Sequence, residues 1–227
     1  MSAEPRVIIF DFDGVVLESA DIKTRAFALL FDEHPDEHVE AIVELHLRLA
    51  GVSRYEKFKL IYEDILELPL DDDELQRLGE EFSRIALEEI LSCEFVTGAR
   101  EFLQRRHRSH ALYVASGTPE EELRHIVRQR RLERFFRGVY GTPAVKADIS
   151  RRILEETGAE PHEAVFIGDA TTDLEGAREA GVPFIGRRPP DGPDPFEGEA
   201  VPVVADLDEL GREWPRICAR LHAGSPA

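Results

Sequence analysis

Two pairs of acidic residues follow short apolar runs in this chain of 227 residues. The runs cover residues 7–10 and 164–168, and the acids after them are Asp11 and Asp13, then Asp169 and Asp173. Such runs are typical of buried parallel strands, whose carboxyl ends meet at one edge of a sheet. Two carboxylates about 4 Å apart repel each other by about 4 kcal/mol at an effective dielectric constant of about 20, so four together need a cation. A site of oxygen ligands that leaves room for a substrate indicates Mg²⁺.

A hydroxyl group and an ammonium group are expected at the same edge of the sheet. Ser116 and Gly117 follow the apolar run 111–115, and Lys146 precedes the helical pattern of residues 149–157. Each has an ordinary alternative, because Ser116 could cap the next helix and Lys146 could be a solvated surface lysine. Beside four acids, however, a hydroxyl and an ammonium would suit a phosphoryl group. The combination indicates phosphoryl transfer.

The order of these motifs resembles the haloacid dehalogenase-like (HAD) hydrolase superfamily. The matching segments lie between residue 7 and about residue 186, and they are Asp11-Phe12-Asp13-Gly14-Val15, Ser116-Gly117-Thr118, Lys146 and Gly168-Asp169-Ala170-Thr171-Thr172-Asp173. The resemblance implies that Asp11 is a nucleophile that forms an aspartyl-phosphate, and that Asp13 is a general acid and then a general base. It also implies phosphate binding by Ser116, Gly117 and Lys146. Mg²⁺ would be held by Asp11, the backbone carbonyl of Asp13, Asp169 and Asp173.

The second acid of the first motif narrows the expected function. The dehalogenases of this superfamily lack an acid there and the ion-pumping ATPases have Thr, so Asp13 favours a phosphatase or a phosphomutase. We expect a Mg²⁺-dependent phosphatase that hydrolyses a small phosphomonoester. A phosphomutase of the β-phosphoglucomutase type is the enzymatic alternative. A receiver-like phosphorylation module is the non-enzymatic alternative, although such a module has no leaving alcohol for Asp13 to protonate.

The periodicity of apolar residues divides the chain into a core and an insert. Residues 19–91 repeat apolar side chains at helical spacing, whereas strand and helix patterns alternate after residue 98. This predicts an α/β fold, a doubly wound, Rossmann-like parallel sheet with an inserted, small, all-helical cap domain. The expected core is residues 1–17 and 94–227, and the expected cap is residues 18–93. Residues 187–199, rich in Pro, Gly and Asp, are expected to form a loop.

A cap inserted after the first motif resembles the branch with phosphoglycolate phosphatases and β-phosphoglucomutases, in which the cap selects the substrate. The segment Gly51-Val52-Ser53-Arg54 resembles the specificity loop of β-phosphoglucomutases. The resemblance implies that Arg54 holds the far end of the substrate, and a guanidinium fork suits a carboxylate or a second phosphate. Alternatively, Gly51 ends one helix, Ser53 caps the next and Arg54 is solvated.

Two positions differ from the phosphomutase pattern. Lys23 stands where those mutases have a histidine, and Thr118-Pro119 replaces a lysine-asparagine pair. Lys23 could face the incoming substrate, or it could be a surface residue paired with Glu18 or Asp21. Both differences favour a phosphatase.

Composition and charge indicate the partners. A formal net charge of −18 with no basic stripe argues against a nucleic-acid partner. The chain has no apolar run as long as a membrane span, and its first polar residues leave no room for a signal peptide. We therefore expect a cytoplasmic enzyme that acts on a small phosphorylated metabolite, without a membrane partner. The oligomeric state stays open.

Overall fold

The centre of the molecule is a parallel sheet whose middle strand carries the first motif. The computed structural model describes residues 4–188 and 194–223, and within them six strands pair in the order β3-β2-β1-β4-β5-β6. Each pairing is parallel. The strands are β1 (Val7–Phe10), β2 (Ala111–Pro119), β3 (Gly138–Thr142), β4 (Ala164–Gly168), β5 (Phe184–Arg187) and β6 (Val203–Val204). The sheet confirms the predicted α/β, doubly wound fold.

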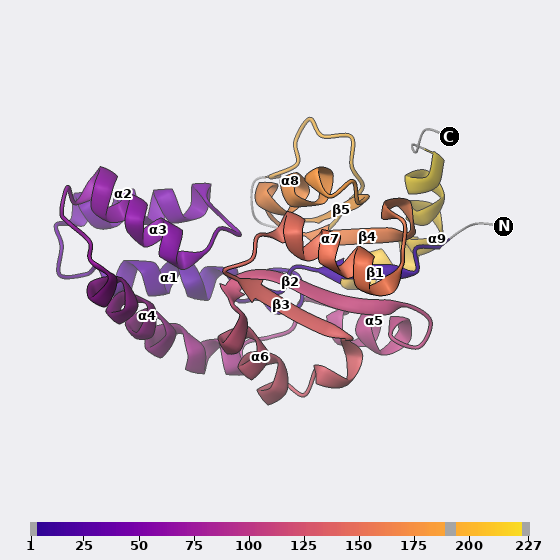
Figure 1. Ribbon diagram of the computed structural model, residues 1–227, viewed down its shortest axis with the longest axis horizontal. Helices are drawn as coiled ribbons and strands as arrows, with labels where there is room; N and C mark the ends of the chain where they lie inside the picture. The colour runs from indigo at the N-terminus through magenta and orange to yellow at the C-terminus, as the bar shows by residue number, and fades with distance from the viewer. Residues whose placement is uncertain (1–3, 189–193, 224–227) are drawn as a thin grey trace.

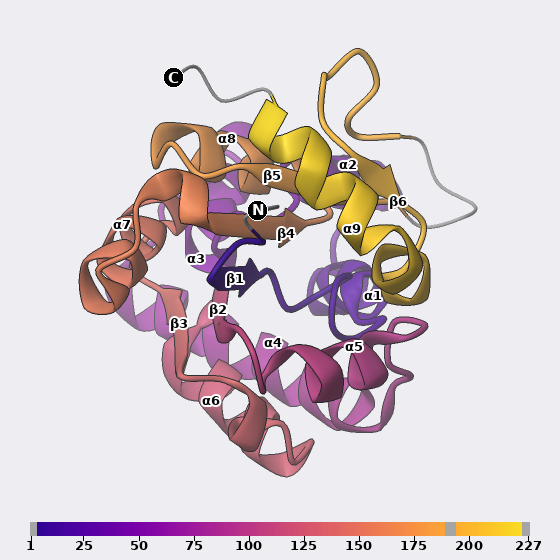
Figure 2. The ribbon, with the colours of Figure 1, turned by 90° about the vertical axis from the view of Figure 1, so that its right-hand side faces the viewer.

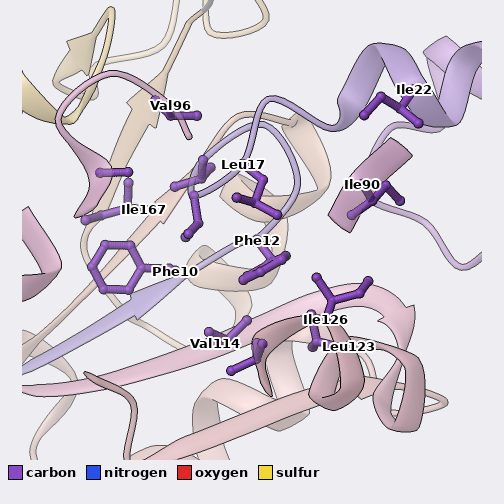
Figure 3. Close-up of a cluster of buried hydrophobic side chains, with 14 of the residues drawn as sticks. Phe10, Phe12, Leu17, Ile22, Ile90, Val96, Val114, Leu123, Ile126 and Ile167 are labelled. Atoms are coloured by element: carbon purple, nitrogen blue, oxygen red, sulfur yellow. The ribbon is translucent and has the colours of Figure 1, made fainter. Parts of the chain in front are cut away.

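Helices cover both faces of the sheet because strand side chains alternate between them. Ile8 and Phe10 of β1 pack with α5 (Ala99–Arg106), α6 (Glu120–Gln129) and α9 (Leu207–Ala223). Val7 and Ile9 pack on the opposite face with α7 (Lys146–Thr157) and α8 (Thr171–Glu179). Figure 2 shows these two layers on either side of the sheet. Phe12 and Leu17 extend the first cluster beyond the end of β1 (Figure 3).

The segment between β1 and α5 forms a separate group of helices. It contains α1 (Ala20–Leu30), α2 (Asp36–Arg48), α3 (Arg54–Leu60), a π-helical turn η1 (Ile61–Ile65) and α4 (Asp72–Ser92). These helices lie beside the carboxyl end of the sheet, on the left in Figure 1. Phe27, Phe58 and Phe82 meet at their centre, with ring centroids 4.8 to 6.3 Å apart. This group is the predicted helical cap.

Several details go beyond the sequence analysis. The apolar run 111–115 forms the first part of β2, which continues through Ser116 and Gly117 to Pro119. Helix α9 was not anticipated, although Leu207, Leu210 and Trp214 are fully buried. Short 3₁₀ turns η2 (Glu133–Phe135) and η3 (Pro161–Glu163) precede β3 and β4. Residues 189–193 of the expected loop 187–199 lie outside the described residues. In the described part of the chain, no helix is both long and apolar enough to span a membrane.

Candidate active site

A cavity of about 140 Å³ lies between the carboxyl end of the sheet and the cap. Its walls include five of the predicted core residues and two predicted cap residues, namely Asp11, Asp13, Ser116, Gly117 and Asp169, then Lys23 and Arg54. A second cavity of about 690 Å³ adjoins it and is lined by Ser116, Gly117 and Lys146. The structure therefore brings both groups of sequence-predicted residues together at one place.

Asp11 follows β1 directly and is fixed by the neighbouring strand. Its backbone N–H donates to the carbonyl of Ile167 at 2.9 Å, and its Oδ1 accepts from the N–H of Phe12 at 2.7 Å. Its Oδ2 lies 3.2 Å from Nζ of Lys146. Burial raises the pKa of Asp11 to about 7, against the opposing effect of Lys146. A second cation beside this carboxylate would favour its charged form.

Two further carboxylates lie beside Asp11. One carboxylate oxygen from each of Asp11, Asp169 and Asp173 falls within 4.8 Å of the other two. Burial, followed by the charges of Asp11 and Asp173, raises the pKa of Asp169 well above its usual value. Crowded, buried carboxylates repel one another, and only oxygen ligands are present. The cluster therefore fits a hard divalent cation such as Mg²⁺.

Both carboxylate oxygens of Asp173 accept hydrogen bonds from neighbouring groups of the protein. Oδ1 accepts a hydrogen bond from Nζ of Lys146. Oδ2 accepts from the backbone N–H groups of Asp169 at 3.2 Å and Ala170 at 3.0 Å. Burial lowers the pKa of Lys146, but the charges of Asp11 and Asp173 outweigh burial and raise this pKa above its usual value. The lysine therefore stays protonated. Asp173 thus orients Lys146 and the loop before α8.

Asp13 points away from the acidic cluster and toward the cap. Its Oδ1 accepts from Oγ of Ser19 at 2.6 Å. Its Oδ2 accepts from Nζ of Lys23 at 2.5 Å and from Oγ1 of Thr118 at 2.9 Å. Burial raises the pKa of Asp13, but Lys23 and these hydrogen bonds outweigh it and lower the pKa below its usual value. Lys23 is therefore paired with Asp13, not with Glu18 or Asp21.

Two glycines allow the chain to approach the site closely. Gly14 has φ +75°, and a Cβ there would lie 2.0 Å from Oδ2 of Asp169. A Cβ on Gly117 would lie 2.4 Å from the carbonyl oxygen of Gly51 in the cap. Ser116, at the edge of the same cavity, accepts from the N–H of Thr118 at 3.1 Å and lies 3.5 Å from Asp13. The Ser116-Gly117 segment thus closes against the cap.

Arg54 is buried, so the alternative of a solvated arginine is wrong, and its side chain lies at the wall of the cavity. Its two terminal nitrogens donate to the carboxylate of Glu122 in α6 at 3.0 and 2.6 Å. It also donates to Oγ of Ser83 at 2.7 Å, and its guanidinium lies 4.4 Å from the centre of the Phe82 ring. The pair with Glu122 joins the cap to the core, whereas Ser83 and Phe82 belong to α4 of the cap.

The sequence analysis missed several side chains around the cavity. Thr118 contacts both Asp13 and Lys23, and Ser19 contacts Asp13. Lys57 and His46 line the cavity from the cap. Thr118 could have been found from its place in the second motif. Lys57 lies in none of the sequence motifs. Its place at the cavity depends on how α3 packs, because the fold turns this face of the helix toward the sheet.

Comparison with known proteins gives the family. A model of the haloacid dehalogenase-like hydrolase family matches residues 8–187. A 5′-nucleotidase from Pseudomonas aeruginosa is 36% identical over 84 residues, which cover 35% of this chain and 38% of that protein. The chain thus spans well under half the length of this curated relative.

Solved structures agree on the fold. A hydrolase from Pseudomonas syringae superposes with a TM-score of 0.78 at 18% identity, over 93% of this chain and 99% of that one. A predicted phosphoglycolate phosphatase from Haemophilus somnus gives a TM-score of 0.70 at 16% identity, over 91% and 96%. The prediction of an enzyme, rather than a receiver-like module, is confirmed by the family match. The chain belongs to the haloacid dehalogenase-like hydrolases.

Proposed function

We propose that this protein is a Mg²⁺-dependent phosphatase that hydrolyses a small phosphomonoester through an aspartyl-phosphate on Asp11. The observation that carries the proposal is the division of the two acids of the first motif. Asp11 lies 3.2 Å from Lys146 and beside Asp169, whereas Asp13 is held by Lys23 and Thr118 on the cap side. Asp11 is thus placed beside one ammonium group and a cluster of acids that could hold a cation, which suits attack, and Asp13 is placed for proton transfer.

The reaction divides into two displacements at phosphorus. In the first, an oxygen of Asp11 forms a bond to phosphorus while the ester P–O bond breaks, and Asp13 in its protonated form gives its proton to the leaving alcohol. In the second, water attacks phosphorus, Asp13 takes a proton from that water, and the bond to Asp11 breaks to release phosphate. The low pKa of Asp13 favours the carboxylate needed in the second displacement. A substrate that draws Lys23 away from Asp13 would favour its protonated form.

Several groups stabilise the transferred phosphoryl group. Lys146, held by Asp173, brings a permanent positive charge next to Asp11. Ser116 and the backbone at Gly117 provide hydrogen-bond donors at the wall of the cavity. Mg²⁺ held by Asp11, Asp169 and the backbone carbonyl of Asp13 would neutralise phosphate charge, with Asp173 acting through Lys146. These residues together would lower the repulsion between the carboxylate of Asp11 and a phosphate dianion.

Residues 18–93 are proposed as the cap domain, and residues 1–17 and 94–227 as the catalytic core, in a cytoplasmic enzyme. Cap and core meet through Arg54 with Glu122 and through Oγ1 of Thr172, which donates to the carbonyl of Ala50 at 2.7 Å. The cavity beside Asp11, of about 140 Å³, suits a short molecule. The substrate would enter when the cap opens and react after it closes.

The test is phosphate release from purified protein. We expect turnover of p-nitrophenyl phosphate with Mg²⁺, loss of turnover with EDTA, and no turnover by Asp11→Asn. Rapid-quench labelling with a ³²P-phosphomonoester should trap one acid-stable phosphoryl group on wild type and none on Asp11→Asn. A phosphomutase would instead convert a sugar 1-phosphate to a sugar 6-phosphate and release little phosphate. Turnover by Asp11→Asn at the wild-type rate would refute the covalent mechanism.

A further inference from the structure

Lys57 of α3 is a buried cation without an acidic partner. Only 3% of its surface is exposed. Its Nζ lies 3.0 Å from Nδ1 of His46 and donates to the carbonyl oxygen of His46 at 3.2 Å. The nearest aromatic ring, Phe27, is 5.5 Å away. Within residues 4–188 and 194–223, no carboxylate forms an ion pair with Lys57. Buried lysines are normally paired, because an isolated buried charge is costly.

The other buried cations of the described chain all have carboxylate partners. Arg54 pairs with Glu122 at 2.6 Å, and Arg187 pairs with Glu18 at 2.6 Å. Lys146 pairs with Asp11 at 3.2 Å and also with Asp173. Lys57 is therefore the exception in a protein with 46 acidic side chains. Its missing counter-ion is the feature that needs an explanation.

His46 does not provide that counter-ion. Burial first, and then the charges of Lys57 and Lys23, lower the pKa of His46 to about 3, so the ring is neutral at pH 7. It can accept a hydrogen bond from Lys57 but it cannot balance the charge. Lys57 and His46 both line the cavity that also contains Asp11 and Asp13. An anion bound in that cavity could therefore contact Lys57, which lies in the wall that the cap provides.

We propose that Lys57 binds a second anionic group of the substrate, a carboxylate or a second phosphate, at the end away from the transferred phosphoryl group. This inference rests on the proposed function and names its substrate class, a short phosphomonoester with a second negative charge. Arg54 is less suited to this role because its terminal nitrogens already donate to Glu122. The second anion would give Lys57 its counter-ion, and His46 would keep the ammonium oriented toward it.

Pairs of compounds that differ only in the second anion test the proposal. Phosphoglycolate is compared with ethyl phosphate, and propane-1,3-diol bisphosphate is compared with propyl phosphate. The first pair reports on a carboxylate and the second on a second phosphate. The variant is Lys57→Met, which keeps the length of the side chain and removes its charge. Lys59→Met is the matched control, because Lys59 lies on the same helix, is half exposed and pairs with Glu56.

We expect wild type to favour the doubly charged member of at least one pair by tenfold or more in kcat/KM. Lys57→Met removes the charge that would pair with the second anion, so it should remove that preference. The fall in kcat/KM caused by Lys57→Met should be at least tenfold larger for the doubly charged member than for the singly charged one. Lys59→Met should behave as wild type. A preference that survives Lys57→Met, an absence of preference in both pairs, or an equal fall for both members would overturn the proposal.

Binding separates this proposal from the proposed function. Calorimetry on wild type and Lys57→Met, both in an Asp11→Asn background, measures affinity for the same compounds without turnover. A tenfold weaker affinity of the Lys57→Met protein for the doubly charged compound alone would support the site even if wild type released no phosphate. Equal affinities with normal turnover would refute the site and leave the phosphatase intact.

Discussion

Removing the charge of Lys57 should stabilise the protein at neutral pH. Burial, followed by the charges of Lys23, Lys146 and Arg54, lowers the pKa of Lys57 from its usual 10.5 to about 7. In the unfolded chain the lysine keeps its usual pKa, so between pH 7 and pH 10.5 the unfolded state binds more protons. The stability of wild type should therefore rise with pH across this window. Lys57→Met lacks the titrating group and should not show that rise.

The size of the effect follows from the pKa difference. At 1.36 kcal/mol per pKa unit, the buried charge costs on the order of 4 kcal/mol at pH 7 and about 2 kcal/mol at pH 9. Loss of the contacts with His46 offsets about 1 kcal/mol of the gain. For a chain of this length, each kcal/mol moves Tm by about 2 to 4 °C. Lys57→Met should thus raise Tm by roughly 6 to 12 °C at pH 7, and by only a few degrees at pH 9.

The assay is thermal unfolding of wild type, Lys57→Met and Lys59→Met at several pH values from 6.5 to about 9.5. Titration of other groups is common to all three proteins and cancels in the differences. Lys59→Met should stay within about 0.5 kcal/mol of wild type, as expected for a surface substitution. A Tm of Lys57→Met at or below that of wild type at pH 7 would refute the reasoning. A difference that does not shrink toward pH 9 would do the same.

Three further changes test the site. Asp11→Asn should abolish turnover without lowering Tm, because the amide is nearly isosteric and relieves repulsion among the acids; a lower Tm would indicate a structural role for the carboxylate. Mg²⁺ at about 100 times its Kd should stabilise wild type by about 2.7 kcal/mol, and Asp169→Asn should remove most of this rise in Tm; an identical melting curve in EDTA and in Mg²⁺ would contradict the cation site. Glu122→Gln should lower the free energy of unfolding by up to about 3 to 5 kcal/mol, because it leaves Arg54 buried without its carboxylate partner. The control is Glu121→Gln, since Glu121 is an exposed residue of the same helix. Equal Tm values for the two variants would argue against the ion pair between cap and core.

The sequence predicted the sheet and the core motifs because their signals are local. Asp11, Ser116 and Asp169 each follow an apolar run, and parallel strands bring such positions to one edge whatever their separation along the chain. Helix α9 was missed. Its buried side chains recur at helical spacing, at Leu207, Leu210, Trp214 and Ile217. Pro215 lies within the helix, however, and a proline inside a helical pattern usually argues against a continuous helix.

The partners of the cap side chains could not be predicted in the same way. Arg54 and Lys57 lie one turn apart on α3, and both are long basic side chains next to the cavity. Only the position of Glu122, which is 68 residues away, decides that Arg54 is paired and Lys57 is not. Spacing within one helix holds no information about a carboxylate on another domain. The partner of Lys23 could not be predicted either. Its ion pair with Asp13 depends on how α1 of the cap packs against the core.

Charged side chains from the core and from the cap line one cavity, and this would couple the binding of a cation to the binding of a substrate. On the core side, the carboxylates of Asp11 and Asp169 crowd together and their pKa values are raised. On the cap side, Lys57 contacts His46 and has no carboxylate partner in the part of the chain that the structure describes. A divalent cation would relieve the repulsion on the core side, and an anionic group of the substrate would pair with Lys57 on the cap side. A phosphomonoester with a second anionic group would contact both the cation and Lys57, so each ligand should bind more tightly when the other is present, and by the same factor in either order.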